Sequence, residues 1–291
     1  MPFHSTSEYL GLPRSESAWI VEDVVPEGGT TLIYGKPKEG KSFAALQMAS
    51  AIATPGSDSW LGFPVTQHGP CVYLQVDTPR SIWVERVETM ISKGYKFDGV
   101  HWADAMDTPY PFNITAEGYA WLKDNVAPLN AKVVFIDVLR EIHGGDENDS
   151  AAMRAVISAL RSACPTSALV MVNHARKENP LSGPGDLMDD SRGSSYTTGR
   201  MDCVVRVSKS RLQLKGRTTG EVEMAISRDG QGCLVLVDAF HQRAMDMIMK
   251  AKGESERELA KRLHAEFEKT KSYEACRSHV RRLLVGLKKK G

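Results

Sequence analysis

The chain has 291 residues, with 42% hydrophobic and 25% charged side chains and a formal net charge of +1. This composition is typical of a globular protein that buries a full core, as one large domain with an appendage or as two small domains. No apolar run approaches the roughly 20 residues that a membrane span needs. The first residues also lack the basic start and apolar stretch of a signal peptide, so we expect a cytoplasmic protein without membrane association.

Charge and cysteine are unevenly placed along the chain. Residues 254–291 hold eleven Lys or Arg against six Asp or Glu, which is +5 and leaves about −4 for the remainder. The five cysteines are scattered and form no C-x-x-C pair. This pattern argues against a zinc site or a disulfide framework and predicts reduced, mostly buried thiols, as in a cytoplasm.

The first predicted strand and helix enclose a glycine-rich motif. Residues 30–34 are a β-branched and aromatic run suited to a buried strand. Residues 43–53 are rich in alanine and predict a helix, which Pro55-Gly56 ends. Between them, residues 35–42 read G-x-x-x-x-G-K-S, the phosphate-binding loop or Walker A motif. A strand before and a helix after are the context in which this motif binds phosphate.

Each part of the motif has a chemical reason. Glycines let the backbone turn tightly, so that its N–H groups point at phosphate oxygens at the start of a helix, where anions are favoured. Lys41 can reach the β- and γ-phosphates, and the Ser42 hydroxyl can coordinate Mg²⁺. The sequence therefore predicts that ATP and Mg²⁺ are bound by Gly35, Lys36, Pro37, Lys38, Glu39, Gly40, Lys41, Ser42 and Phe43. The alternative is a glycine-rich turn without a ligand.

Strands and helices alternate through most of the remaining chain. Further helices are predicted at Ser81–Lys93, Ala116–Asn125 and Ser150–Ala163, and further strands at Cys71–Val76, Val133–Asp137, Ala168–Asn173, Val204–Val207, Arg211–Leu214, Val222–Ile226 and Leu234–Val237. Such alternation predicts an α/β fold with a mostly parallel sheet flanked by helices. Short turns join the last four strands and predict an antiparallel extension at one edge.

Four regions are predicted: an N-terminal extension (1–18), an α/β core (19–238), a linker (239–253) and a C-terminal basic helical module (254–291). Within the core, residues 178–199 form a long loop rich in Gly, Pro, Asp and Ser, typical of a functional or disordered segment. In the C-terminal module, Ser255 and Glu258 form a capping box, and a second helix carries Cys276 and Val280 on its apolar face. The module suits a helix-turn-helix-like or partner-docking unit, or a solvated helix pair.

The strand Val133–Asp137 is apolar and ends in a carboxylate, which is the form of a Walker B element. In such sites the aspartate holds Mg²⁺, often through water, beside the phosphate loop. Ser42 and Asp137 are therefore the predicted magnesium ligands. A buried strand that merely ends in aspartate is the alternative.

The stretch from Trp19 to Val237 resembles the RecA-like ATPase core, and within it the RepA-type hexameric replicative helicases. Three segments carry the resemblance: the Walker B strand continuing through residues 139–149 (Leu-Arg-Glu-Ile-His-Gly-Gly-Asp-Glu-Asn-Asp), Arg192-Gly193-Ser194-Ser195, and Trp60-Leu61-Gly62 followed by Gly69-Pro70-Cys71-Val72-Tyr73-Leu74. Their combination is more specific than the phosphate loop alone. The resemblance implies a RecA-like fold and hydrolysis of ATP, with Mg²⁺, by a ring of identical subunits.

The resemblance also assigns individual roles. In the family a glutamate after the second strand polarises the attacking water; here Asp77 stands there, one methylene shorter, which puts the rate of hydrolysis in question. Asn173 and His174 would sense the γ-phosphate, where many relatives carry two histidines. Lys215 and Arg217 match the K-x-R element, which reaches the triphosphate of the neighbouring subunit. The alternatives are a turn-starting Asp77, a structural His174 and a solvated basic hairpin tip.

RecA-like motors hold single-stranded nucleic acid on the loops after the Walker B and sensor strands. Here these are residues 143–149 and 176–200, with Arg176, Lys177, Arg192 and Arg200 as basic groups, Tyr196 as a stacking ring, and Glu178, Asp186, Asp189 and Asp190 as acidic groups that oppose binding. Residues 146–149 resemble an incomplete calcium loop, and Asp149 as a helix N-cap is the alternative.

The sequence thus predicts an ATP-dependent ring motor, hexameric by resemblance, that moves on or unwinds single-stranded DNA. We expect any primase or loader to be a separate partner. Two other functions fit the same motifs: a RecA-like recombination or annealing ATPase that coats single strands, and a nucleotide-gated regulator or DNA-binding adaptor that hydrolyses slowly. A stable filament would favour the first, and partner binding without DNA-stimulated turnover the second.

Overall fold

The computed structural model describes residues 3–12, 18–104, 116–142, 149–175 and 199–237, and beyond them Ala244, 247–248, 250–251, 254–267, Tyr273, 276–277, 280–281 and Leu284. The chain divides into two compact units. The first comprises Met1–Glu223 and Arg228–Leu234, and the second Met224–Ser227 and Val235–Gly291. The four predicted regions stay a prediction.

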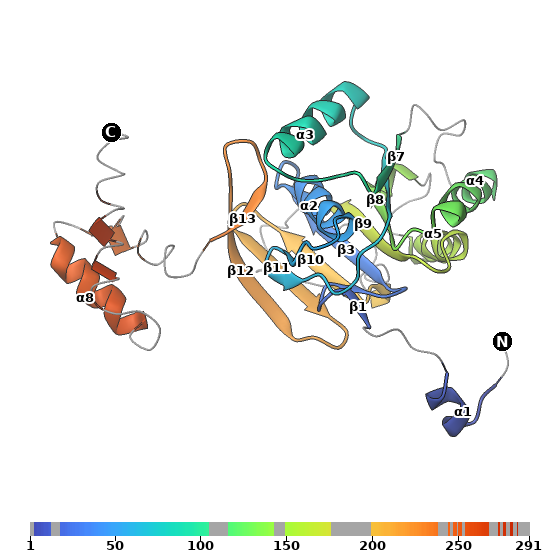
Figure 1. The fold of residues 1–291 in the computed structure, drawn as a ribbon, viewed down its shortest axis with the longest axis horizontal. Coiled ribbons are helices and arrows are strands. Elements are labelled where there is room, and N and C mark those ends of the chain that lie inside the picture. The colour runs from blue at the N-terminus through green and yellow to red at the C-terminus, as the bar shows by residue number, and fades with distance from the viewer. Residues whose placement is uncertain are drawn as a thin grey trace. The chain divides into compact units, whose positions relative to one another are not determined.

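The first unit holds most residues of a large sheet, together with several helices (Figure 1). The helices are α1 (Thr6–Leu10), α2 (Lys41–Ala53), α3 (Arg80–Ser92), α4 (Ala116–Val126) and α5 (Ser150–Ala163), with short 3₁₀ turns at Ala127–Leu129 and Leu139–Ile142. Two small hairpins are formed by β1 (Trp19–Val21) with β2 (Val25–Pro26) and by β4 (Ser59–Trp60) with β5 (Phe63–Pro64). No helix in the described part of the chain has the length and apolar character needed to cross a bilayer.

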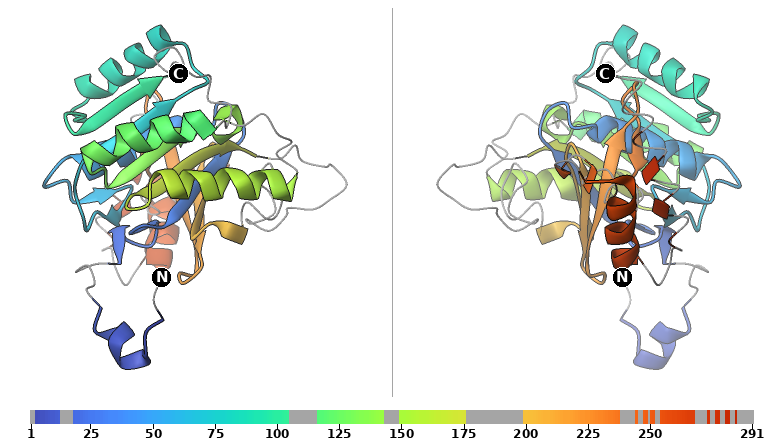
Figure 2. Two further views of the ribbon diagram at one scale, coloured as in Figure 1. Left: turned by 90° about the vertical axis from the view of Figure 1, so that its right-hand side faces the viewer. Right: turned by 90° about the vertical axis from the view of Figure 1, so that its left-hand side faces the viewer.

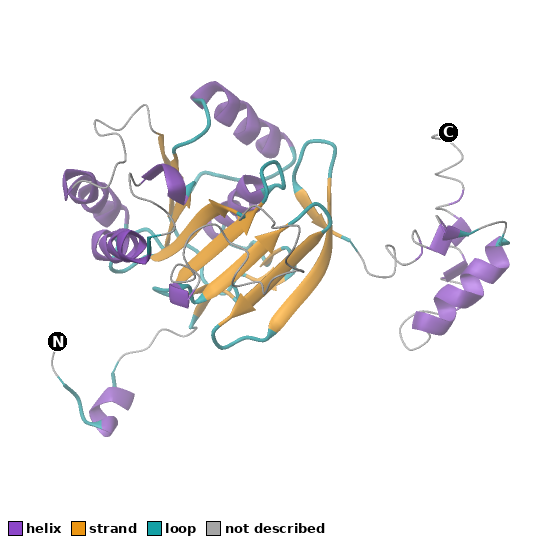
Figure 3. Ribbon diagram, turned by 180° about the vertical axis from the view of Figure 1, so that it is seen from behind, coloured by secondary structure: helices purple, strands orange, loops and turns teal. Residues whose placement is uncertain are grey.

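In the described part of the chain, nine strands form one sheet in the order β13-β12-β11-β10-β3-β9-β8-β6-β7. The strands are drawn in orange in Figure 3. Their bounds are β3 (Thr30–Gly35), β6 (Cys71–Gln75), β7 (Val100–Asp104), β8 (Val133–Asp137), β9 (Ala168–His174), β10 (Cys203–Val207), β11 (Arg211–Gly216), β12 (Glu221–Arg228) and β13 (Leu234–Leu236). The strands from β7 to β10 pair in parallel, and β10 pairs antiparallel with β11. The predicted parallel sheet with an antiparallel extension is confirmed.

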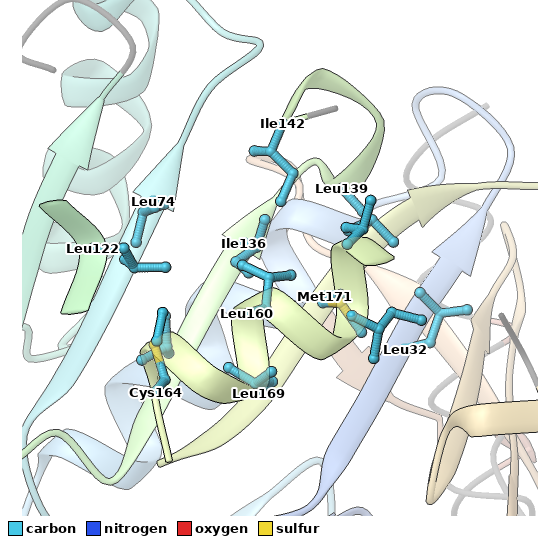
Figure 4. Packing of buried hydrophobic residues seen from close by; sticks show 14 of the residues in the cluster. Leu32, Leu74, Leu122, Ile136, Leu139, Ile142, Leu160, Cys164, Leu169 and Met171 are labelled. Carbon is cyan, nitrogen blue, oxygen red and sulfur yellow. The ribbon is translucent and has the colours of Figure 1, made fainter. Parts of the chain in front are cut away.

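The two faces of the sheet bury alternate side chains of the same strands. On one face, strand residues such as Leu32, Ile136 and Met171 pack with Leu122 of α4 and Leu160 of α5 (Figure 4). The ribbons of α4 and α5 lie next to each other over the sheet in Figure 2, in green and yellow-green. On the other face, Tyr73 and Phe135 stack with ring centroids 5.3 Å apart, and Trp83 of α3 packs on Tyr73. Because both faces are covered, the central strands read as continuous apolar runs, which is why the sequence predicts them well.

Local signals explain several element boundaries. The Asp149 carboxylate accepts a hydrogen bond of 2.8 Å from the backbone N–H of Ala151, so Asp149 is the N-cap of α5, the alternative to a calcium loop. In α2, ten of thirteen residues are buried, which suits the alanine-rich sequence of a helix packed on the sheet. All five cysteines are free and buried, as predicted.

Strand β7 is absent from the sequence prediction. Its five residues are Val-His-Trp-Ala-Asp, and only Val100 is buried. Among the described strands, β7 is the last of the sheet, and β6 is its neighbour there. A short edge strand carries a mixed polar pattern and no apolar run, so pattern analysis finds little there.

The second unit contains α8 (Glu256–Phe267) and a small apolar cluster. The predicted capping box is present, because Ser255 N–H donates to Glu258 Oε2 at 2.8 Å and Glu258 N–H donates to Ser255 Oγ at 3.3 Å. The cluster joins Leu259 and Leu263 of α8 with apolar residues before and after this helix: Ala244, Met247, Cys276 and Val280. On the predicted basic face, Arg277 bonds Glu256 at 3.2 Å, so part of that charge is neutralised within the unit.

Candidate nucleotide-binding site

The parallel register brings the predicted site residues to one edge of the sheet. Gly35 at the end of β3 is in register with His174 of β9, and Asp137 of β8 is in register with Gln75 of β6. Since these strands run in the same direction, their carboxyl ends form a common rim. The loops that follow them enclose a cavity of about 410 Å³. Its lining includes Pro37, Lys38, Gly40, Lys41, Ser42, Phe43, Asp77, Thr78, Arg86, Asp137, His174 and Arg228.

The two motif glycines are needed for different reasons. A Cβ added to Gly35 would lie 2.2 Å from the carbonyl oxygen of Val207, because the end of β3 passes close to the end of β10. Gly40 has φ +85°, a left-handed conformation, and is the N-cap of α2. Within the loop, Lys36 N–H donates to Glu39 Oε2 at 2.7 Å. The start of α2, with Lys41 and Ser42, therefore lies at the cavity.

Lys41 lies at the bottom of the loop and is 7% exposed. Its Nζ donates to the carbonyl oxygen of Lys36 at 3.0 Å. Burial lowers the pKa of Lys41, while the nearby carboxylates of Asp137, Glu39 and Asp77 act in the opposite direction. A desolvated ammonium group at the start of a helix is a strong site for phosphate oxygens.

Asp137 is 2% exposed and accepts a hydrogen bond of 2.8 Å from the Tyr73 hydroxyl. Burial raises the pKa of Asp137, and the hydrogen bonds from Tyr73 and Ser42 counteract this rise. The Ser42 hydroxyl and the Asp137 carboxylate are therefore adjacent hard oxygen donors. No group of three or more His, Cys, Asp or Glu in the described residues could hold a metal, but Mg²⁺ needs only one or two protein ligands when phosphates and waters complete its shell. The pair fits Mg²⁺.

Asp77 follows β6 and faces the same cavity. Its Oδ1 accepts a hydrogen bond of 2.8 Å from the Thr78 hydroxyl. The buried side chain of Gln75 holds this turn through Thr78, accepting from its N–H at 2.7 Å and donating to its carbonyl oxygen at 2.5 Å. The turn presents a carboxylate to the cavity, as the resemblance implies.

His174 lines the cavity, whereas Asn173 is buried next to it and does not. The two end β9 beside the phosphate loop, and Ala175 N–H donates to the carbonyl oxygen of Gly35 at 2.9 Å. Any shift of this strand end would therefore be transmitted to the loop that binds phosphate. The role of Asn173 and His174 as sensors of the γ-phosphate stays a prediction.

Lys215 and Arg217 are not brought to this site. Gly216 is in register with Cys203, and Cys203 with Thr31 near the start of β3. Arg217 is therefore more than about 13 Å along the strand direction from Gly35 at the other end. In its own subunit Arg217 donates to the carbonyl oxygens of Met201 at 3.1 Å and Gly199 at 2.8 Å, and its Nε lies 3.6 Å from Asp202 Oδ1.

Sequence reasoning missed four residues of the site. Tyr73 and Gln75 lie within a predicted strand, where a hydroxyl and an amide among apolar residues were the only signal. Arg86 of α3 lies with its guanidinium carbon 5.3 Å from the ring centroid of Phe43 and 5.0 Å from that of Trp83. Arg228 ends β12, far away in sequence, and no local pattern indicates it.

Several predicted functional segments lie outside the described residues. They are residues 143–148, the Arg192-Gly193-Ser194-Ser195 segment with the rest of the 176–198 loop, and the terminal lysines at 288–290. Of the basic residues predicted to contact nucleic acid in that loop, Arg200 is described and is exposed.

A phosphate loop after a central parallel strand, separated by one strand from a strand that ends in a buried aspartate, is typical of a RecA-like P-loop ATPase. Residues 3–180 match the AAA_25 family, described as an AAA domain, and the chain belongs to this family. Among solved structures, it is similar to a KaiC-like protein from the hyperthermophilic archaeon Pyrococcus horikoshii OT3, with a TM-score of 0.51 and 16% identity over 78% of this chain and 99% of that one. At this identity the likeness shows the fold alone, and it confirms the predicted RecA-like architecture.

Proposed function

We propose that this chain is an ATP-hydrolysing, ring-forming motor that acts on single-stranded DNA. The observation that carries the ATPase part is the meeting of Lys41, Ser42, Asp77 and Asp137 at one cavity. Each of these groups is expected in hydrolysis of a nucleoside triphosphate, and they come from three separate segments of the sequence.

Each of these residues has a separate role in phosphoryl transfer. Lys41 and the loop N–H groups bind the β- and γ-phosphates and neutralise their charge. Ser42 and Asp137 would hold Mg²⁺, which would supply further positive charge to the phosphate oxygens. Asp77 accepts a hydrogen bond from the attacking water and orients it toward the γ-phosphorus. His174, beside the loop, detects whether the γ-phosphate is present.

The ring is the part of the proposal that concerns Lys215 and Arg217. Their register lies toward the start of β3, away from the phosphate loop, which supports a part in hydrolysis that involves a second copy of the chain. An arginine supplied by a neighbour stabilises transition-state charge and raises turnover by about 10³–10⁵-fold. We propose a homo-oligomeric ring, by family resemblance a hexamer, with DNA on loops that face its channel.

The test measures ATP hydrolysis with and without single-stranded DNA for wild type and for Lys41→Ala and Arg217→Ala. Lys209→Ala is the matched control, because Lys209 is an exposed residue of the turn between β10 and β11 and does not line the cavity. Single-stranded DNA should stimulate ATP hydrolysis by wild type and by the control. The Lys41→Ala and Arg217→Ala variants should have no ATP hydrolysis. If wild type binds ATP but single-stranded DNA does not stimulate its hydrolysis, the proposed motor function is refuted.

A nucleotide-gated regulator is the second candidate, and Asp77 is the observation that favours it. A carboxylate one methylene shorter than glutamate would orient water less well, so ATP would persist as a signal. Slow turnover that DNA leaves unchanged, together with ATP-dependent binding of a protein partner, would identify this function.

A stable filament on single-stranded DNA without unwinding would instead identify a recombination or annealing ATPase.

A further inference from the structure

Arg228 has a guanidinium group in the nucleotide cavity that the functions above leave unused. Its Nη1 donates to the carbonyl oxygen of Lys38 at 2.7 Å. Its Nε and Nη2 are buried and have no hydrogen-bond partner among the described residues. A guanidinium carries five N–H donors in a rigid fork and stays charged, so buried donors without acceptors are costly. Such a group in a cavity indicates an anionic ligand.

The guanidinium also lies against a particular part of the phosphate loop. A Cβ on Gly40 would lie 3.2 Å from Arg228 Nε, and the Lys38 carbonyl is on the same segment. The N–H groups of this part of the loop cradle the α- and β-phosphates. Arg228 and Lys41 are close enough for their like charges to interact, because Arg228 contributes to lowering the pKa of Lys41. Two cations held near one another are stabilised when phosphate lies between them.

The turn that follows Arg228 is fixed from several sides. Lys93, just after α3, pairs with Asp229, and Asp229 Oδ1 accepts hydrogen bonds from the N–H groups of Gln231 at 3.1 Å and Cys233 at 3.0 Å. Leu234 exchanges two hydrogen bonds of 2.9 Å with the side chain of Gln47 in α2. Arg228 is therefore held in place before any ligand arrives, which reduces the entropy lost on binding.

We propose that Arg228 binds the α- and β-phosphates of the nucleotide from within the same subunit. This inference rests on the proposed nucleotide site and adds a residue to it. The ligand class is a nucleoside di- or triphosphate, since both contain these two phosphates. Arg228 thus differs from Arg217, whose proposed action needs a neighbouring subunit and the γ-phosphate.

The experiment compares Arg228→Gln with wild type in titrations of ADP and ATP. Arg211→Gln is the matched control, because Arg211 is an exposed arginine of the adjacent strand β11 whose Nη1 pairs with Glu223 at 2.9 Å. Arg228→Gln should weaken ADP and ATP binding by the same factor, about 10- to 100-fold, as for loss of charge-assisted hydrogen bonds. Turnover at saturating ATP should change less than threefold, because no contact made only in the transition state is lost.

Thermal unfolding without nucleotide separates this role from a structural one. Arg228→Gln should unfold at the same or a higher temperature than wild type, because it removes a buried cation with unsatisfied donors. A lower midpoint with unchanged nucleotide affinity would overturn the inference in favour of a structural arginine. Weakened ATP binding with unchanged ADP binding would overturn the assignment to the α- and β-phosphates. Failure of wild type to bind either nucleotide would refute the proposed function itself.

Discussion

Individual charged residues of the nucleotide site are held in conditions that oppose their charge. Burial lowers the pKa of Lys41 and raises that of Asp137, so each is desolvated in the protein without nucleotide. Removing a charged group from water costs free energy of folding, and a bound ligand of opposite charge offsets that cost. The site should therefore reduce the stability of the empty protein and be stabilised strongly by nucleotide with Mg²⁺.

Replacement of Asp137 by asparagine tests whether this buried carboxylate lowers the stability of the protein while serving the binding of nucleotide and Mg²⁺. Asn keeps an oxygen that can accept from the Tyr73 hydroxyl but carries no buried charge. We expect the variant to gain about 1 kcal/mol of unfolding free energy, or about 2–4 °C in midpoint, and to lose Mg²⁺-dependent hydrolysis. Because the folded state raises the pKa of Asp137, the gain should shrink as pH falls through that raised value, where wild type is also neutral.

Calorimetry of both proteins across pH measures this difference. Asp98→Asn, at an exposed carboxylate outside the cavity, is the control and should leave the midpoint near that of wild type. A lower midpoint for Asp137→Asn would mean that the carboxylate stabilises the empty protein, contrary to the expectation.

Asp77 gives a second prediction for a single residue, and it concerns the rate of ATP hydrolysis alone. Asp77→Asn keeps the size of the side chain but removes the charge that orients water, so kcat should fall by about 10²-fold or more. Nucleotide affinity should stay within about twofold of wild type, because the loop and Lys41 are unchanged. Asp77→Glu should retain turnover. Steady-state kinetics with a nucleotide titration distinguish these results; an unchanged kcat for Asp77→Asn would leave Asp77 as a turn residue only.

At the scale of elements, the phosphate loop depends on the contact between the ends of β3 and β10. Gly35→Ala would bring a Cβ to 2.2 Å from the Val207 carbonyl oxygen, and backbone paired on both sides cannot easily move. We expect a loss of about 3 kcal/mol in unfolding free energy. Urea unfolding measures it, with Gly220→Ala as the control, since a Cβ there meets nothing within 4 Å. Equal stability of the two variants would show that the end of β10 moves to make room for the added methyl group.

Elements with strong local signals are those that the sequence predicts. Strand β8 and helix α5 begin and end where the pattern places them, because an apolar run and the cap at Asp149 define them. Strand β7 has no such signal. In the site, the phosphate loop and Asp137 form local motifs and are predictable, whereas Arg86 and Arg228 reach the cavity only through tertiary packing. Their distance in sequence from the motif, and the absence of any pattern around them, explains why they were missed.

At the scale of the whole molecule, the sheet separates two sets of predicted catalytic residues. Lys41, Asp77 and Asp137 lie at its carboxyl rim, while Arg217 lies near the start of β3. There Arg217 donates two hydrogen bonds to the backbone carbonyls of Gly199 and Met201, at the end of the loop predicted to contact DNA. Two explanations of an inactive Arg217 variant therefore compete: loss of a group that acts on the neighbouring subunit, and loss of order in its own chain.

Mixing two inactive variants distinguishes these explanations. A site formed across a ring needs Lys41 from one subunit and Arg217 from its neighbour. Lys41→Ala subunits still carry Arg217, and Arg217→Ala subunits still carry an intact phosphate loop. If Arg217 acts in trans, an equimolar mixture should recover about a quarter of wild-type hydrolysis, since about one interface in four then combines both intact groups. If Arg217 only orders its own chain, the mixture should stay inactive, because every subunit with an intact loop lacks its own Arg217.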